Sequence, residues 1–289
     1  METHIRVDKP PYIFPYFGGK RRVARAYGPL LTGKRIDTLY EPFAGSASFT
    51  LWAATNNIAK RYILGDIQKP LCHLWEDIID KPNQTSDGYT AIWKRANEVG
   101  WEDHYYHVRD HYNATYDTAA LLFLLTATFN ATPRYRGDQF IGTPRPSQYR
   151  LPKHPDRVAK AIHQTSYLLK GRTEIRCTDW ENSIQDAQRN DFIFLDPPYD
   201  SVTSAYYANM SYEHFVRGLT KLTERHISMM VSYDGVSRKR IHKRLPKHLN
   251  FTRTYAYKTI GNKDGKTHYL DTIYLFPQIP KLEDQVFQL

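Results

Sequence analysis

The stretch FIFLDPPYD, residues 192–200, runs from an apolar segment into an acid, two prolines and a tyrosine. The apolar segment predicts a buried strand, and the prolines end it and stiffen the backbone. The Asp196 carboxylate and the Pro197 carbonyl can each accept one N–H of an aromatic amine, which localises its lone pair for attack on an electrophilic methyl group. The Tyr199 ring can stack on the base, a contact worth about 1 to 3 kcal/mol. An ordinary turn is the alternative, because Asp-Pro often opens one.

A second candidate site lies in EPFAGSASF, residues 41–49. Gly45 permits a close turn between a strand and a helix, and Asp66 ends the next strand at about the spacing of the ribose-binding acid in dinucleotide sites. The second glycine of the usual G-x-G pattern is replaced, since the sequence is Gly45-Ser46-Ala47. Taken alone, the pattern therefore leaves a tight turn with a solvated aspartate as the alternative.

These residues need a strand, loop, helix, strand unit to position them. Such a unit implies a parallel sheet with ligands at the carboxyl ends of its strands, so we expect Glu41 and Asp196 to open on one cleft. The hydrophobic pattern predicts a basic helix after Gly18-Gly19, and then a strand, a helix, a strand and a helix over residues 36–40, 46–57, 61–67 and 70–80.

The chain changes character between residues 80 and 164. TAIWKRANEV and DTAALLFLLTATFN predict helices, and a long polar stretch follows, which is unusual in a compact domain unless it is functional. Strands then resume in TEIRCTDW, DFIFLDPPY and HISMMVSYD, and FTRTYAYKTI with YLDTIYLF predicts an antiparallel hairpin at the sheet edge. We expect one α/β sheet domain with a mostly helical insertion between its second and third strands.

The composition narrows the class of protein. A chain of 289 residues that is 41% hydrophobic can bury a full core, and a net charge of +10 favours a polyanionic partner such as nucleic acid. Cys72 and Cys177 cannot supply a zinc cluster or a disulfide framework, which indicates a reducing compartment. The N-terminus lacks an apolar signal region, and no stretch approaches the roughly 18 apolar residues of a membrane span. We therefore expect a cytoplasmic protein without a membrane partner.

Four motifs in this order resemble the Dam-type (D12 class, alpha group) DNA adenine N6-methyltransferases: YFGGK at 16–20, EPFAGSA at 41–47, the acid Asp66, and DPPY at 196–199 after an insertion. The resemblance covers nearly the whole chain. It implies an α/β fold, namely a Rossmann-like S-adenosylmethionine-dependent methyltransferase sheet. The implied catalytic domain has two parts, 1–78 and 165–289, around a helical target-recognition domain at 79–164 with a DNA-reading hairpin at 130–150.

The resemblance implies a site-specific enzyme that transfers a methyl group from S-adenosyl-L-methionine to N6 of a flipped-out adenine in double-stranded DNA. The base must leave the stack before the reaction, and no metal is needed. Cytosine N4 methylation, an RNA substrate and a catalytically silent DNA-binding relative are the alternatives; aspartate rather than serine at position 196 disfavours N4 chemistry. A bacterial or phage-infected cell is the implied setting. The recognition sequence and a cognate restriction endonuclease as partner stay open.

The resemblance also assigns roles to single residues. Asp66 is expected at the cofactor ribose, Trp180 at its adenine, and Phe17 in the core. The implied catalytic residues are Asp196, Pro197, Pro198 and Tyr199. The implied cofactor-binding residues are Tyr16, Lys20, Glu41, Phe43, Gly45, Asp66, Asp179, Trp180 and Asp196.

For DNA, the resemblance points to FNATPRYRGDQF, where a helix ending in an asparagine leads into an arginine-bearing hairpin. Arginine can donate two hydrogen bonds to guanine, but phosphate contact competes as an explanation for any single arginine. The implied DNA-binding residues are Lys20, Asn130, Thr132, Arg134, Tyr135 and Arg136. A second basic cluster predicts either a solvated helix face or a phosphate-contacting one; it comprises Arg238, Lys239, Arg240, Lys243, Arg244 and Lys247.

Overall fold

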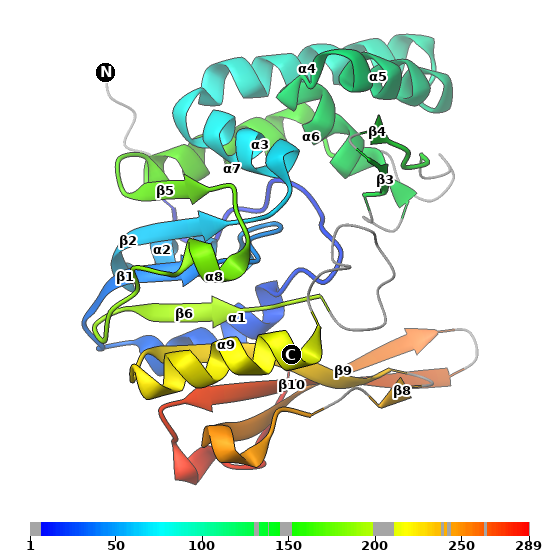
Figure 1. Cartoon of the computed structure of the whole chain (residues 1–289). Helices are drawn as coiled ribbons and strands as arrows, with labels where there is room; N and C mark the ends of the chain where they lie inside the picture. The colour runs from blue at the N-terminus through cyan, green and yellow to red at the C-terminus, as the bar shows by residue number, and fades with distance from the viewer. Residues whose placement is uncertain are drawn as a thin grey trace.

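The computed structural model describes residues 7–129, 133–137, 139–144, 152–198, 211–237, 240–241, 244–262 and 265–288. In this part of the chain the main sheet has nine strands, with helices on both faces and a helical lobe at one end (Figure 1). No helix over these residues is long and apolar enough to cross a membrane.

The parallel half of the sheet carries the motif residues. Its strands are β1 (Ile36–Glu41), β2 (Ala59–Gly65), β5 (Thr173–Arg176), β6 (Phe192–Leu195) and β7 (Ser228–Ser237). β1 pairs with β2 on one side and with β6 on the other, and all these pairings are parallel. Because parallel strands end at the same edge, Glu41, Asp66 and Asp196 lie along one edge of the sheet.

The antiparallel half completes the sheet. β9 (Thr252–Asn262) and β10 (Gly265–Phe276) form the expected hairpin, and β10 pairs with β7. The hairpin is not the outermost element, because β11 (Val286–Gln288) pairs with β9 beyond it. Figure 1 shows this hairpin on one side of the carboxyl ends of β1, β2 and β6, and the helical insertion on the other.

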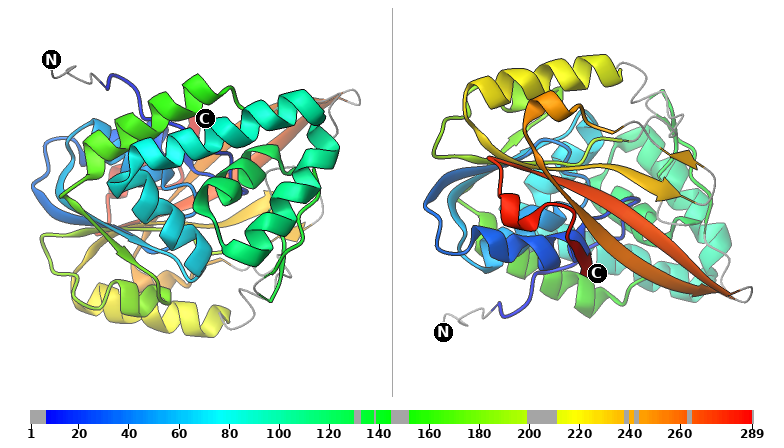
Figure 2. Two further views of the ribbon diagram at one scale, coloured as in Figure 1. Left: turned by 90° about the horizontal axis from the view of Figure 1, so that it is seen from above. Right: turned by 90° about the horizontal axis from the view of Figure 1, so that it is seen from below.

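Side chains alternate between the two faces of the sheet, and each face has its own helices. Leu39, Phe192 and Phe194 pack with the first set, and Tyr40 and Ile193 with the second. The first set comprises α1 (Arg21–Tyr27) with η1 (Gly28–Leu31), α2 (Ser48–Thr55), α3 (Lys69–Asp80) and α7 (Pro155–Leu169); the second comprises α8 (Trp180–Ser183) and α9 (Tyr212–Glu224). Figure 2 shows α9 and α1 on opposite faces.

The insertion between β2 and β5 is a helical lobe, as the sequence predicted. It contains α4 (Pro82–Val99), α5 (Trp101–Thr115) and α6 (Thr118–Ala127), and α6 is buried from Ala119 to Ala127. α5 was not among the expected elements, and α4 begins earlier than its apolar pattern indicated. The domain boundary expected at residue 164 falls inside α7, which packs on both α3 and α4.

The basic cluster near residue 240 does not form the expected helix face where it is described. Arg240 lies in β8 (Arg240–Ile241), which pairs with β7, and Lys247 begins the short η4 (Lys247–Leu249). Arg238, Lys239 and Lys243 lie outside the described residues. The chain closes through η5 (Pro280–Leu282), which precedes β11.

Candidate active site

An ion pair joins the N-terminal turn to the end of β6. Lys20 Nζ lies 3.0 Å from Asp196 Oδ1, and the two side chains are only 9% and 18% exposed. Burial raises the pKa of Asp196 to about 6, while Lys20 opposes this rise. The site therefore holds a largely desolvated carboxylate with a cation beside it.

Two further residues act on Asp196 that the sequence analysis did not identify. Ser232 donates a side-chain hydrogen bond that lowers the pKa of Asp196, whereas the charge of Asp271 raises it. Ser232 follows Val231, the β7 partner of Leu195, and is fully buried. A serine inside the apolar stretch SMMVS was the available signal.

β6 ends at Leu195, and two prolines follow Asp196. Pro197 is buried and Pro198 is half-buried. Tyr199 lies outside the described residues, so its place beside Asp196 stays a prediction.

Glu41 is enclosed rather than open to a cleft. Its residue is 3% exposed, and its two carboxylate oxygens accept hydrogen bonds from Phe49 N at 3.3 Å and Thr50 N at 2.7 Å. These N–H groups belong to the first turn of α2, where a helix has no backbone acceptors of its own. Burial raises the pKa of Glu41 to about 7, and the charge of Asp196 adds to the rise. Glu41 therefore holds the first turn of α2 in place, and its pKa depends on the charge of Asp196.

Asp66 links two loops at the same edge. Its carboxylate accepts hydrogen bonds from Gly45 N at 3.2 Å and Gln68 N at 3.0 Å. Burial raises the pKa of Asp66 to about 6, and these N–H groups oppose the rise. Gly45 itself has a φ of +47°, and a Cβ there would lie 3.0 Å from the Tyr16 ring. Glycine is required for this close approach.

The segment after β5 brings aromatic side chains to the second face. Phe43 stacks with Trp180 at 6.1 Å between ring centroids, and Phe215 meets Trp180 edge-on at 5.3 Å. Trp180 is 6% exposed, so most of its ring is core. Asp179 is exposed and caps α8 by accepting a hydrogen bond from Asn182 N at 3.0 Å.

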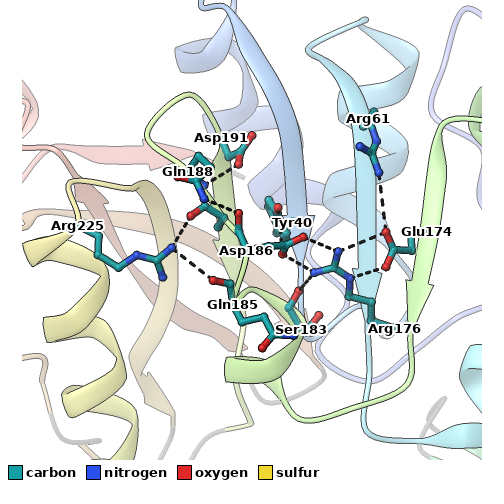
Figure 3. A network of polar contacts seen from close by, with 11 residues as sticks. Tyr40, Arg61, Glu174, Arg176, Ser183, Gln185, Asp186, Gln188, Asp191 and Arg225 are labelled. Atoms are coloured by element: carbon teal, nitrogen blue, oxygen red, sulfur yellow. Dashed lines mark hydrogen bonds and ion pairs between the residues drawn. The ribbon is translucent and has the colours of Figure 1, made fainter.

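A network of polar contacts lies at the end of β5, beside the four-residue helix α8 (Figure 3). Arg176 donates to both oxygens of Asp186 at 2.6 and 2.8 Å, and to the Ser183 carbonyl at 2.8 Å. It also bonds Glu174, so one half-buried guanidinium ties β5 to the end of α8. An open cavity of about 640 Å³ lies here, away from Asp196; it is lined by Glu174, Arg176, Thr178, Asn182, Gln185 and Asp186.

The arginine-bearing hairpin is a short ladder fixed to α5. It consists of β3 (Tyr135–Arg136) and β4 (Gln139–Phe140), and Phe140 exchanges two hydrogen bonds with the Asn113 side chain. Tyr135 packs edge-on against buried Phe140 at 5.2 Å, whereas Arg134 and Arg136 are exposed. Asn130 and Thr132 lie outside the described residues.

Phe17 corrects an expectation. It was predicted to be core, but its side chain is 59% exposed. The physical reason is that Phe17 occupies the tip of a turn in which Gly19 N donates to the Tyr16 carbonyl at 3.1 Å.

The parallel strands with their glycine turn, buried Asp66 and Asp196-Pro197-Pro198 at one edge define a Rossmann-like methyltransferase. A model of the D12 class N6 adenine-specific DNA methyltransferase family matches residues 16–285. The chain belongs to this family and is an adenine-specific DNA methyltransferase. Membership implies DNA as the substrate and S-adenosylmethionine as the methyl donor.

Individual relatives agree with the family. The type II methyltransferase M1.LlaDCHI of Lactococcus lactis subsp. cremoris is 24% identical over 266 residues, which span 86% of this chain and 88% of that protein. The type II methyltransferase M.CviBI of Paramecium bursaria Chlorella virus NC1A is 26% identical, over 89% of this chain and 96% of that protein. The DNA N-6-adenine-methyltransferase of Escherichia phage P1 is 28% identical, over 78% of this chain but only 30% of that longer protein.

Glu41→Gln is expected to flatten the pH dependence of the free energy of unfolding. Because burial raises the Glu41 pKa to about 7, the stability that this group contributes is present below its unfolded pKa and is lost as pH rises through the folded value. Urea unfolding of cofactor-free protein at about pH 5 and about pH 8 measures this loss. Asp37→Asn is the control, because Lys60 lowers the pKa of exposed Asp37. An unchanged slope in Glu41→Gln contradicts the assignment.

Arg176→Gln is expected to raise the KM for S-adenosylmethionine several-fold while kcat stays near the wild-type value. The reason is that Arg176 positions α8 and the adjacent Trp180, the residue predicted to contact the cofactor adenine. Arg253→Gln is the matched control: Arg253 Nη2 lies 2.6 Å from Asp284 Oδ1, an ion pair on the far strand β9. Arg176→Gln loses the pairs with Asp186 and Glu174, and Arg253→Gln loses the pair with Asp284, so both variants should have a lower melting temperature. Equal cofactor KM values in the two variants would show that Arg176 acts on stability alone.

Proposed function

We propose that Asp196 and Pro197 hold the exocyclic amine of a flipped-out adenine, with Tyr199 stacked on its ring. The observation that carries this proposal is the largely buried Asp196 carboxylate, 3.0 Å from Lys20 at the carboxyl edge of the sheet. The carboxylate accepts one N6–H and the Pro197 carbonyl accepts the other, which localises the lone pair on N6. Pro198 restricts the backbone that follows, so the two acceptors keep their directions.

The reaction forms a bond between N6 and the methyl carbon and releases one proton from N6; the bond between that methyl carbon and the cofactor sulfur would break, with S-adenosyl-L-homocysteine as the leaving group. S-adenosylmethionine, when bound, supplies the electrophilic methyl group. Asp196 accepts the N6–H hydrogen bond and suits proton acceptance near neutral pH, because burial raises its pKa to about 6. The lone pair of N6 attacks directly, so the reaction needs no metal and no nucleophilic side chain.

We propose that the cofactor lies between the glycine turn and α8. Asp66 fits its ribose, because each carboxylate oxygen accepts one N–H and keeps capacity for a hydroxyl donor. Gly45 allows close approach, and half-buried Phe43 offers a ring face beside Trp180. Asp179 lies next to that ring pair. The remaining proposed contributors are Tyr16 and Lys20 on the N-terminal turn, and Glu41, which positions α2.

For duplex DNA we propose contacts from Lys20, Arg134 and Arg136, with Tyr135 holding the hairpin on Phe140. Asn130 and Thr132 complete the predicted set. In this proposal the helical lobe at 79–164 recognises the target sequence, and the parts at 1–78 and 165–289 perform catalysis. Two of the relatives are named type II methyltransferases, so we propose a cognate restriction endonuclease as a candidate partner. A neighbouring endonuclease gene would support that partner.

Expression of the protein in cells without adenine methylation should produce N6-methyladenine within one short DNA sequence. Sequencing that detects modified bases gives the site, and nucleoside digestion with mass spectrometry identifies the base. Asp196→Ala should reduce kcat at least about 100-fold, because it removes a contact strengthened in the transition state. DNA binding by Asp196→Ala serves as the folding control. Near-normal kcat in that variant refutes the role of Asp196.

The kcat/KM of the wild-type enzyme should rise with pH through about 6, because the ionised form of Asp196 accepts the amine N–H. Lys20→Met should move this inflection to higher pH, since Lys20 lowers the Asp196 pKa. Lys20→Arg keeps a cation and should leave the inflection nearly in place. This pair of variants separates Asp196 from Glu41. An identical inflection in Lys20→Met would assign the titration to another group.

A further inference from the structure

The turn before α1 presents an aromatic ring to solvent. Phe17 and Gly18 are its central residues, and Gly18 has a φ of +76°, as the third position of a type II turn requires. A side chain at the second position of such a turn points outward. The phenyl ring of Phe17 is accordingly 59% exposed, in a chain that buries most of its described phenylalanines.

Both ends of this turn are fixed to the active site. On one side, the Tyr16 ring lies against Gly45 of the β1–α2 loop and meets Phe14 edge-on at 6.3 Å. On the other side, Lys20 pairs with Asp196 at 3.0 Å. A Cβ on Gly19 would lie 3.3 Å from Ser46 Oγ, so the turn also rests closely on that loop. The backbone that carries the exposed ring is therefore held in a fixed place.

We propose that Phe17 stacks on a nucleobase of the substrate DNA at the entrance to the adenine site. The inference rests on the proposed role of Asp196 in holding the flipped adenine. Two residues lie between Phe17 and Lys20, so their Cα atoms lie within about 11 Å of each other. Because Lys20 Nζ lies 3.0 Å from Asp196, DNA that delivers its adenine amine to Asp196 passes near this turn. An aromatic ring binds any base through its π-face, so the contact adds affinity without sequence preference.

Two other binding partners for the Phe17 ring are less consistent with the structure. The cofactor would lie on the Tyr16 and Gly45 side of the turn, where the packing is close. A second copy of this chain would bring another net charge of +10 to the same surface. DNA has the opposite charge and is the substrate of the family.

The test compares Phe17→Ala with Phe17→Tyr, which keeps a stacking ring, and with Tyr167→Ala. Tyr167 is the matched control, because its ring is 62% exposed on α7. The substrate is a duplex containing the site found by modified-base sequencing. Phe17→Ala should raise the KM for DNA about tenfold with an unchanged KM for S-adenosylmethionine, while Phe17→Tyr and Tyr167→Ala stay near wild type.

Salt dependence supplies a second readout. Loss of a phosphate contact would lower the slope of binding against salt by about one, so a lower slope in Phe17→Ala would show that the substitution disturbs charged contacts rather than stacking. A wild-type DNA KM in Phe17→Ala, a rise in the cofactor KM alone, or a change in oligomeric state overturns the proposal. In each of those outcomes the wild-type enzyme still produces N6-methyladenine. Failure of the proposed function differs, because Asp196→Ala would then retain near-normal kcat.

Discussion

The burial of carboxylates along one edge of the parallel sheet is the constraint on which the site depends. Removal from water raises the pKa of Glu41 to about 7 and those of Asp66 and Asp196 to about 6. Each acid is stabilised differently: Glu41 by the first turn of α2, Asp66 by loop N–H groups, and Asp196 by Lys20. Neutral backbone donors suit the two carboxylates that do not meet the reacting amine. The cation tunes the one that is proposed to meet the reacting amine.

At edge strand β5, ion pairs and hydrogen bonds take the place of apolar packing against a helix. The distribution of helices over the sheet explains this difference. α9 covers the middle of its face through Phe215 and Leu219, but α8 is a single turn and cannot shield the edge strand β5. Arg176 fills that role with hydrogen bonds to the end of α8 and to its own strand. A guanidinium can do so at an exposed corner because it stays charged and bonds in two directions.

The parallel strands and the helical insertion were predictable from the sequence, because they leave local patterns of apolar, glycine and acidic residues. The failures came from information outside the local pattern. α5 buries Tyr105, Val108 and Tyr112 among histidines and charged residues, so its apolar spacing is obscured. β11 depends on pairing with the more distant strand β9, which residue type does not encode, and β8 is a two-residue strand beside β7, too short to show a pattern. The donors to the Glu41 carboxylate were likewise unpredictable, because an acid that ends a strand can face either a ligand or a helix.

The N-terminal turn is one short segment that contributes to the proposed cofactor site, to the ion pair with Asp196 and to the proposed DNA contact. Tyr16 closes over Gly45 beside the proposed cofactor site, Lys20 supplies the cation for Asp196, and Phe17 projects from the turn between them. Lys20 and Asp196 are far apart in sequence, so their pairing depends on the folded sheet. The turn is held by its contacts with the active site, and any group that displaces it also removes the cation. Desolvation would then act on Asp196 without its main opposing interaction, and the carboxylate would become protonated more readily.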